Sequence, residues 1–162
     1  MATLKLPETL LSTTILVVDD EPEHIQWLLD YIEAKGMKTQ LACSVGEAVA
    51  LAEKNQYRGY IVDLNIPLGN WTSVFKSTSD IYEKYKGFLV IKYVRTQGNL
   101  GQNVTAYSAH YNEQITGEAK TLYCEYTTKG RVKEFKSEVE KLINTPLPSH
   151  GVIKSTSAGR TK

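Results

Sequence analysis

TTILVVDDEP, at residues 13–22, is an apolar segment that ends in two adjacent aspartates, Asp19 and Asp20. The four residues 15–18 are all aliphatic, as in a strand that is covered on both faces of its sheet. Two neighbouring carboxylates repel each other, and partial burial strengthens this repulsion. The segment therefore predicts a buried central strand whose end needs a positively charged partner.

Strand-like and helix-like segments alternate five times along the chain. The helices are marked by apolar residues at helical spacing, a proline in a first turn, a glycine after a last turn and a Ser-x-x-Glu capping pattern. This alternation predicts a parallel sheet with helices on both faces. The expected strands after the first cover residues 37–43, 59–63, 103–108 and 121–128, and the expected helices begin near residues 22, 44, 80, 111 and 132.

Five polar residues stand at or just after the carboxyl ends of the expected strands: Asp19, Asp20, Asp63, Ser108 and Lys129. In open α/β sheets, binding sites form beyond these strand ends, at the switch in strand order. Three carboxylates offer the hard oxygen ligands that Mg²⁺ or Mn²⁺ prefers. A lysine and a hydroxyl would be further partners for phosphate, and a carboxylate can attack phosphorus. The sequence thus indicates a site for phosphoryl transfer to Asp63.

Four segments carry a more specific pattern, and they occur in the order ILVVDDEP, YIVDLNIP, VTAYSAH and YTTKG. With these segments the sequence resembles the receiver domains of two-component response regulators over residues 13–144. The resemblance implies a doubly wound (βα)5 fold with a five-stranded parallel sheet in the flavodoxin-like order 2-1-3-4-5. It also implies a signalling module rather than an enzyme, since receivers catalyse only their own phosphoryl transfer and dephosphorylation.

The resemblance assigns the acids to a metal and phosphoacceptor site. Asp63 would accept a phosphoryl group from a phosphohistidine on a sensor histidine kinase or phosphotransfer protein. Asp20 and Asp63 would bind Mg²⁺, or Mn²⁺, directly, together with the backbone carbonyl of Asn65. Asp19 would act mainly through a metal-bound water. The metal would allow an anionic aspartate to accept an anionic phosphoryl group.

The remaining residues of the pattern would form a switch. Lys129 would pair first with the acceptor carboxylate and then with the phosphoryl oxygens. Ser108 would move toward the phosphoryl group, and Tyr126 would turn inward. The charge gained on phosphorylation, about −1.5 to −2 near neutral pH, would bias this two-state switch. Asn65 and His110, each two residues beyond a site residue, are expected to tune dephosphorylation.

The amino-acid composition limits which binding partners and which cellular location we expect. The 19 Lys and Arg residues nearly balance the 18 Asp and Glu residues, which does not fit a nucleic-acid-binding body. No apolar run is long enough to span a bilayer and no signal peptide is evident. We therefore expect that the chain does not bind or cross a membrane. Cys43 and Cys124 lack a metal-ligand spacing, which favours a reduced, cytoplasmic setting with both side chains buried. A downstream effector protein is expected, and a homodimer through the last helices is compatible with the sequence.

Two features depart from the family pattern. Gly130 follows Lys129 where receivers usually have a proline preceded by a cis bond, and we expect a trans bond here because cis is costly without proline. The 45 positions from Asp63 to Ser108 exceed the usual interval. The excess predicts an insertion near residues 68–80, which we expect to act as a partner-recognition or lid element. The alternative is that its aromatic residues pack on the following helix and extend the core locally.

The expected organisation is an N-terminal extension at residues 1–12, a receiver domain at 13–144 and a flexible tail at 145–162. The tail is rich in Pro, Ser, Thr and Gly, as mobile ends are. Such a chain would be a stand-alone receiver, a relay element or a fragment of a longer regulator.

Two other functions fit parts of the pattern. A dehalogenase-type phosphatase also combines an aspartate nucleophile, Mg²⁺, a hydroxyl and a lysine, but its nucleophile lies in a D-x-D motif on the first strand. Here the first strand ends in Asp19 and Asp20. A receiver-like interaction module that no longer needs phosphorylation would usually have lost an acid or the lysine. A phosphomonoesterase assay tests the first alternative, and a lack of Mg²⁺-dependent labelling at Asp63 would favour the second.

Overall fold

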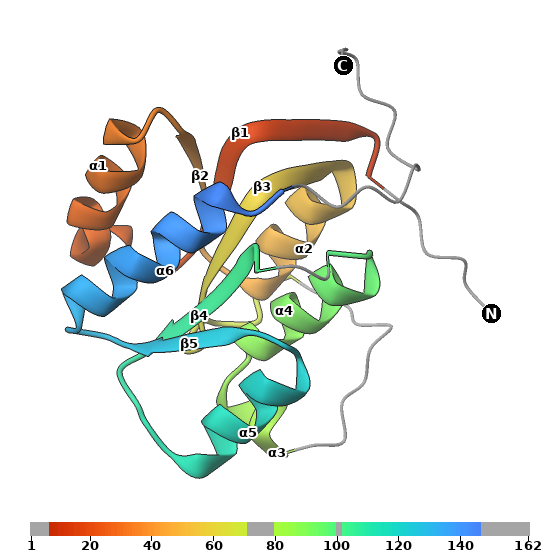
Figure 1. The fold of residues 1–162 in the computed structure, drawn as a ribbon. Helices are drawn as coiled ribbons and strands as arrows, with labels where there is room; N and C mark the ends of the chain where they lie inside the picture. Colours follow the sequence, from red (N-terminus) through yellow and green to blue (C-terminus); the bar gives the residue numbers. More distant parts are fainter. Residues whose placement is uncertain (1–6, 71–79, 100–101, 147–162) are drawn as a thin grey trace.

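The computed structural model describes residues 7–70, 80–99 and 102–146, and Figure 1 shows how they are arranged. Among these residues, one sheet of five parallel strands has the order β2-β1-β3-β4-β5. This result confirms the predicted fold class and strand order. The strands are β1 (Thr9–Val18), β2 (Lys38–Ala42), β3 (Asn55–Asp63), β4 (Val104–Ser108) and β5 (Glu125–Thr128).

Helices cover both faces of the sheet, as Figure 1 shows. On one face, α1 and α6 bury apolar side chains of the central strands such as Ile15 and Ile61. On the other face, α2, α4 and α5 bury side chains such as Leu16 and Val62. A 3-10 turn at Pro22–Ile25 leads into α1. The helices are α1 (Gln26–Ala34), α2 (Val45–Lys54), α3 (Asp80–Lys84), α4 (Gly87–Thr96), α5 (Glu113–Thr121) and α6 (Val132–Asn144).

Two strands start four residues earlier than the sequence pattern predicts, and one starts four residues later. β1 and β3 each begin four residues before the expected start, because Thr9 pairs with Asn55 and the pairing continues past a register shift. β5 begins at Glu125 rather than at residue 121. The reason is that α5 extends through Thr121, and Tyr123 in the connection has a left-handed backbone with φ of 54°.

The single helix expected from Asp80 is divided into α3 and α4. The second helix begins at Gly87, whose backbone N–H donates to the carbonyl of Leu64, just after β3, at 3.1 Å. A Cβ atom at Gly87 would lie 2.3 Å from the backbone oxygen of Asp63, closer than real atoms approach. The glycine therefore lets α4 start directly against the chain segment that carries Asp63.

The start of α2 is capped from two sides. The Ser44 hydroxyl accepts a hydrogen bond from the backbone N–H of Glu47 at 3.1 Å, as the capping pattern predicts. The carbonyls of Pro67 and Leu68 accept the first two backbone N–H groups of the helix, those of Val45 and Gly46, at 3.0 and 2.9 Å. The chain leaving β3 thus passes over the first turn of α2 before the expected insertion.

The cysteine prediction is correct for one residue and wrong for the other. Cys124 is buried, but Cys43 is exposed. Cys43 follows the last residue of β2, which is an edge strand, and its backbone N–H donates to the Glu47 carboxylate at 2.6 Å. At this position the side chain faces solvent instead of a packed helix.

Parts of the expected organisation lie outside the described residues. This applies to residues 1–6 of the N-terminal extension, to residues 71–79 of the insertion and to residues 147–162 of the tail. The role of the insertion accordingly stays a prediction. In the described part of the chain, no helix has the length and apolar character needed to cross a membrane.

Candidate functional site

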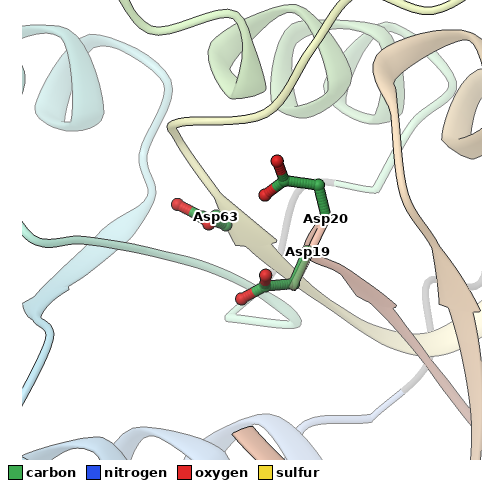
Figure 2. A group of neighbouring side chains, drawn as sticks. All are labelled: Asp19, Asp20 and Asp63. Carbon is green, nitrogen blue, oxygen red and sulfur yellow. The ribbon is translucent and has the colours of Figure 1, made fainter. Parts of the chain in front are cut away.

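Three carboxylates converge at the carboxyl edge of the sheet, as Figure 2 shows. β1 and β3 are neighbours with Val18 opposite Val62, so Asp19 and Asp20 emerge beside Asp63. One carboxylate oxygen from each of the three acids lies within 4.8 Å of the other two. Asp19 and Asp63 are buried, whereas Asp20 is exposed. Negative charge therefore surrounds a single point. A cation at that point would contact all three side chains.

Asp63 is held by two donors in a poorly solvated position. Its Oδ1 accepts the backbone N–H of Asn65 at 2.9 Å, and its Oδ2 pairs with Lys129 Nζ at 3.0 Å. Burial raises the pKa of Asp63 to about 6, because the two donors and the lysine charge only partly offset the loss of hydration, and nearby Asp19 opposes them. Asp63 therefore holds a proton more readily than an exposed aspartate does.

Both oxygens of Asp19 accept hydrogen bonds from the protein. The backbone N–H of Glu21 donates to Oδ1 at 2.7 Å, and the hydroxyl of Tyr107 donates to Oδ2. The expected role of Asp19 through a metal-bound water stays a prediction. Burial and the negative charge of Asp19 raise the pKa of Tyr107, so its hydroxyl keeps its proton and remains a donor.

Lys129 follows β5 and reaches across the end of β4. Its backbone N–H donates to the carbonyl of Ser108 at 2.8 Å, which continues the strand pairing to the rim. Gly130 has a left-handed backbone with φ of 95°, and the Lys129–Gly130 bond is trans, since the described residues contain no cis peptide bond. The trans bond agrees with the expectation, and the lysine still reaches Asp63 without the usual proline.

Ser108 and Asn65 are joined at the same rim. The Ser108 hydroxyl donates to Asn65 Oδ1 at 2.9 Å and accepts the backbone N–H of His110 at 3.1 Å. The serine is fully buried, whereas His110 is exposed. The structure thus links Asn65, Ser108 and the start of the following loop, but it does not test any of them as tuning or switch residues.

Tyr126 lies half-buried on β5 and contacts the loop after β4. Its hydroxyl donates to the backbone carbonyl of His110, and its ring stacks on Tyr111 with the centroids 6.2 Å apart. The His110 ring makes an edge contact with Tyr85 at 5.8 Å between centroids. Tyr126 is therefore connected to the segment that follows Ser108, which is where a switch tyrosine would need to act.

The structure brings the three acids, Asn65, Ser108 and Lys129 to one edge of the sheet, and it links Tyr126 to the loop that contains His110. Sequence reasoning missed Tyr107. Taken alone, a tyrosine directly before Ser108 predicts only a strand residue. The signal that could have found it is its position: side chains alternate along a strand, so Tyr107 must face the helices opposite to those that Ser108 faces. A polar hydroxyl on that buried face needs a partner, and Asp19, which follows the end of β1 on the far side of β3, provides it.

Comparisons with known proteins bear on the fold. No protein-family model and no curated protein matches the sequence. Among solved structures, a two-component response regulator from Clostridium difficile is 19% identical, with a TM-score of 0.61 over 82% of this chain and 99% of that one. The non-phosphorylated HemR receiver domain from Leptospira biflexa is 20% identical, with a TM-score of 0.63 over 85% and 98%.

A third similar structure contains a metal ion. The receiver domain of the sensor histidine kinase PA1611 from Pseudomonas aeruginosa is 18% identical, with a TM-score of 0.60 over 83% of this chain and 99% of that one. That structure has a magnesium ion coordinated in its active-site cleft. With its five parallel strands in the order 2-1-3-4-5, the chain has the receiver-domain fold of these response-regulator and kinase structures.

Proposed function

We propose that this chain is a phosphoacceptor receiver in a two-component phosphorelay, with Asp63 as the phosphorylated residue. The observation that carries the proposal is the combination of three converging carboxylates with a lysine 3.0 Å from the central one. An acidic cluster alone, or an ion pair between a lysine and an acid alone, is common on protein surfaces. Here two of the acids are buried, and the lysine contacts the acid at the end of the central strand.

The donor set suits Mg²⁺ or Mn²⁺, which prefer carboxylate and carbonyl oxygens. Asp20 and Asp63 would hold the ion, with the backbone carbonyl of Asn65 as a third ligand and Asp19 acting through water. The raised pKa of Asp63, caused mainly by burial, supports this assignment because a buried carboxylate gains most from a cation. When bound, the ion would supply positive charge between the acids and the oxygens of an incoming phosphoryl group.

The proposed reaction moves one phosphoryl group from nitrogen to oxygen. A carboxylate oxygen of Asp63 forms a bond to phosphorus as the bond from phosphorus to the imidazole nitrogen of the donor breaks, and the electron pair stays on the imidazole. Lys129 balances the charge of the acceptor before transfer and of the phosphoryl oxygens afterwards. Catalysis on this account consists of positioning and charge neutralisation, so the chain would not turn over other substrates.

The proposed output is a change at the face formed by β4, β5 and the loop after β4. Ser108 would exchange its bond to Asn65 for one to the phosphoryl group, and Tyr126 would leave the carbonyl of His110. A sensor histidine kinase or phosphotransfer protein would be the donor, and an effector protein would recognise the changed face. We further propose a cytoplasmic location, as for the donor kinase domain.

The test is labelling with acetyl phosphate and Mg²⁺, followed by intact-mass measurement. The account predicts the gain of one phosphoryl group, which disappears on chelation of Mg²⁺ and in Asp63→Asn. Asp30→Asn, which changes an exposed aspartate on α1, is the matched control and should label like the wild type. Labelling that persists in Asp63→Asn would refute the assignment. Turnover of p-nitrophenyl phosphate would instead favour the phosphatase alternative.

A further inference from the structure

The side chain of Tyr107 touches two charged groups of the proposed site. Its hydroxyl donates to Asp19 Oδ2, and Lys129 Nζ lies 5.1 Å from the centroid of its ring. The ring is itself fixed, because only 1% of the residue is exposed and Phe135 of α6 packs against it with the centroids 5.0 Å apart. One immobile residue therefore connects the acid at the end of β1 with the lysine after β5.

Asp19 depends on this contact for its orientation. Its other oxygen accepts the backbone N–H of Glu21, so a rotation of the carboxylate would break at least one of the two bonds. An unpaired oxygen on a buried carboxylate is costly, which favours the observed rotamer strongly over others. The tyrosine hydroxyl thus determines where Asp19 presents its charge to the neighbouring acids.

Lys129 is held between two partners. Its side chain is 34% exposed, and a lysine with that freedom would sample many rotamers. Asp63 attracts the ammonium group on one side, and the face of the Tyr107 ring attracts it on another through a cation–π contact. The ring keeps the ammonium group near the rim even when Asp63 no longer carries the full charge of a free carboxylate.

We infer that Tyr107 is a positioning residue of the phosphoacceptor site, which fixes Asp19 for metal binding through its hydroxyl and supports Lys129 through its ring. This inference rests on the proposed function, since it assigns Asp19 to a Mg²⁺ site. Tyr107 acts through other residues and does not touch the phosphoryl group. Residues that orient metal ligands or their waters commonly affect metal affinity by about 10- to 100-fold when they are changed.

The experiment measures Mg²⁺ affinity by titration calorimetry of the unphosphorylated protein. Tyr107→Phe removes the hydroxyl and retains the ring, and it should weaken Mg²⁺ binding by about tenfold or more. At saturating Mg²⁺ its labelling by acetyl phosphate should return to near the wild-type rate, because the ring still supports Lys129. Tyr57→Phe is the matched control: Tyr57 is also buried and its hydroxyl also donates to a side-chain oxygen, of Gln40, but it lies near the other end of β3.

A double-mutant cycle then separates positioning from a general loss of stability. In the background of Asp19→Asn, Tyr107→Phe should change Mg²⁺ affinity less than twofold, because the acid it orients is gone. Mg²⁺ affinity of Tyr107→Phe within twofold of the wild type, or an equal loss in Tyr57→Phe, would overturn the inference. An undiminished loss in the Asp19→Asn background would also overturn it.

The two proposals fail in different ways. A wild-type protein that binds Mg²⁺ but accepts no phosphoryl group would refute the proposed function and leave the role of Tyr107 in metal binding standing. Normal labelling of the wild type, together with unchanged Mg²⁺ affinity in Tyr107→Phe, would refute only the role of Tyr107.

Discussion

Lys129 Nζ lies 3.0 Å from Asp63 Oδ2, and this pair joins the ends of β5 and β3, which are separated in the sheet by β4. The lysine side chain is 34% exposed and the aspartate side chain 2%. The ion pair thus lies at the boundary between solvent and a buried carboxylate. Such a pair can open toward an incoming anion, because the lysine can turn without any movement of the strands.

Replacing the lysine should slow phosphorylation strongly. Lys129→Met retains most of the side-chain volume but removes the charge that balances the acceptor and the phosphoryl oxygens. We expect the labelling rate with acetyl phosphate to fall about 100-fold at saturating Mg²⁺, the usual scale for loss of one stabilising group in a transition state. Lys133→Met, on the exposed side of α6, should label normally. Equal rates for both variants would show that Lys129 has no part in transfer.

Asp63→Asn should stabilise the protein in the absence of divalent metal. In the folded chain burial raises the pKa of Asp63 to about 6, above the value of about 3.9 for an unfolded aspartate. The folded state therefore holds this proton more tightly, and the stabilisation from it is complete below pH 4 and is lost as the pH rises through 6. At pH 7.5 the neutral asparagine should be more stable by about 2 kcal/mol.

Urea denaturation at pH 4 and pH 7.5, with EDTA present, measures this difference. The increase in the free energy of unfolding caused by Asp63→Asn should be small at pH 4 and larger at pH 7.5. Added Mg²⁺ should then raise the stability of the wild type and leave that of the variant nearly unchanged. A variant less stable than the wild type at pH 7.5 would mean that the ion pair with Lys129 outweighs the cost of burying the carboxylate.

Gly87→Ala should destabilise the fold because its Cβ would collide with the backbone of Asp63. The added Cβ atom would lie 2.3 Å from a backbone oxygen. Turning a side chain cannot relieve this clash, so α4 must move away from the end of β3. We expect a loss of about 2–3 kcal/mol, as for other overpacked sites, together with weaker Mg²⁺ binding. Chemical denaturation and calorimetry measure the two effects.

Gly117→Ala is the matched control for that substitution. Gly117 lies within α5, and a Cβ atom there would meet nothing within 4 Å. Alanine should stabilise this helix by roughly 0.5–1 kcal/mol, because glycine is the poorer helix former. If both substitutions had the same effect, the close approach of α4 to Asp63 would not be a real constraint.

The rim of the sheet could be predicted from the sequence, because the three acids, Ser108 and Lys129 each stand at or just after the end of an expected strand and parallel strands place their carboxyl ends at one edge. That rule places Lys129 at the same rim as Asp63, and the resemblance to receiver domains predicts the contact between them that the structure contains. Tyr107 and Gly87 could not be assigned in the same way. The role of Tyr107 depends on which helix and which acid share its face of the sheet, and that of Gly87 on how closely α4 approaches β3. Both are properties of packing between distant segments.

His110→Ala should change the lifetime of the phosphorylated protein. His110 is exposed and follows Ser108 by two residues, and its backbone N–H donates to the Ser108 hydroxyl. Its backbone carbonyl would still accept the Tyr126 hydroxyl in the variant, so the substitution changes the ring alone. We expect a several-fold change in the rate of phosphate loss after removal of acetyl phosphate, followed by intact mass. An unaltered half-life would exclude the His110 side chain from dephosphorylation.

The most direct test of the central claim is to identify the modified residue. Borohydride reduces an aspartyl phosphate to homoserine, a permanent mass change that peptide mass spectrometry can locate after proteolysis. Protein treated with acetyl phosphate and Mg²⁺ and then with borohydride should contain homoserine at position 63, and protein treated with EDTA should not. Homoserine at Asp19 or Asp20, or at no aspartate in a sample that has gained phosphoryl mass, would contradict the account.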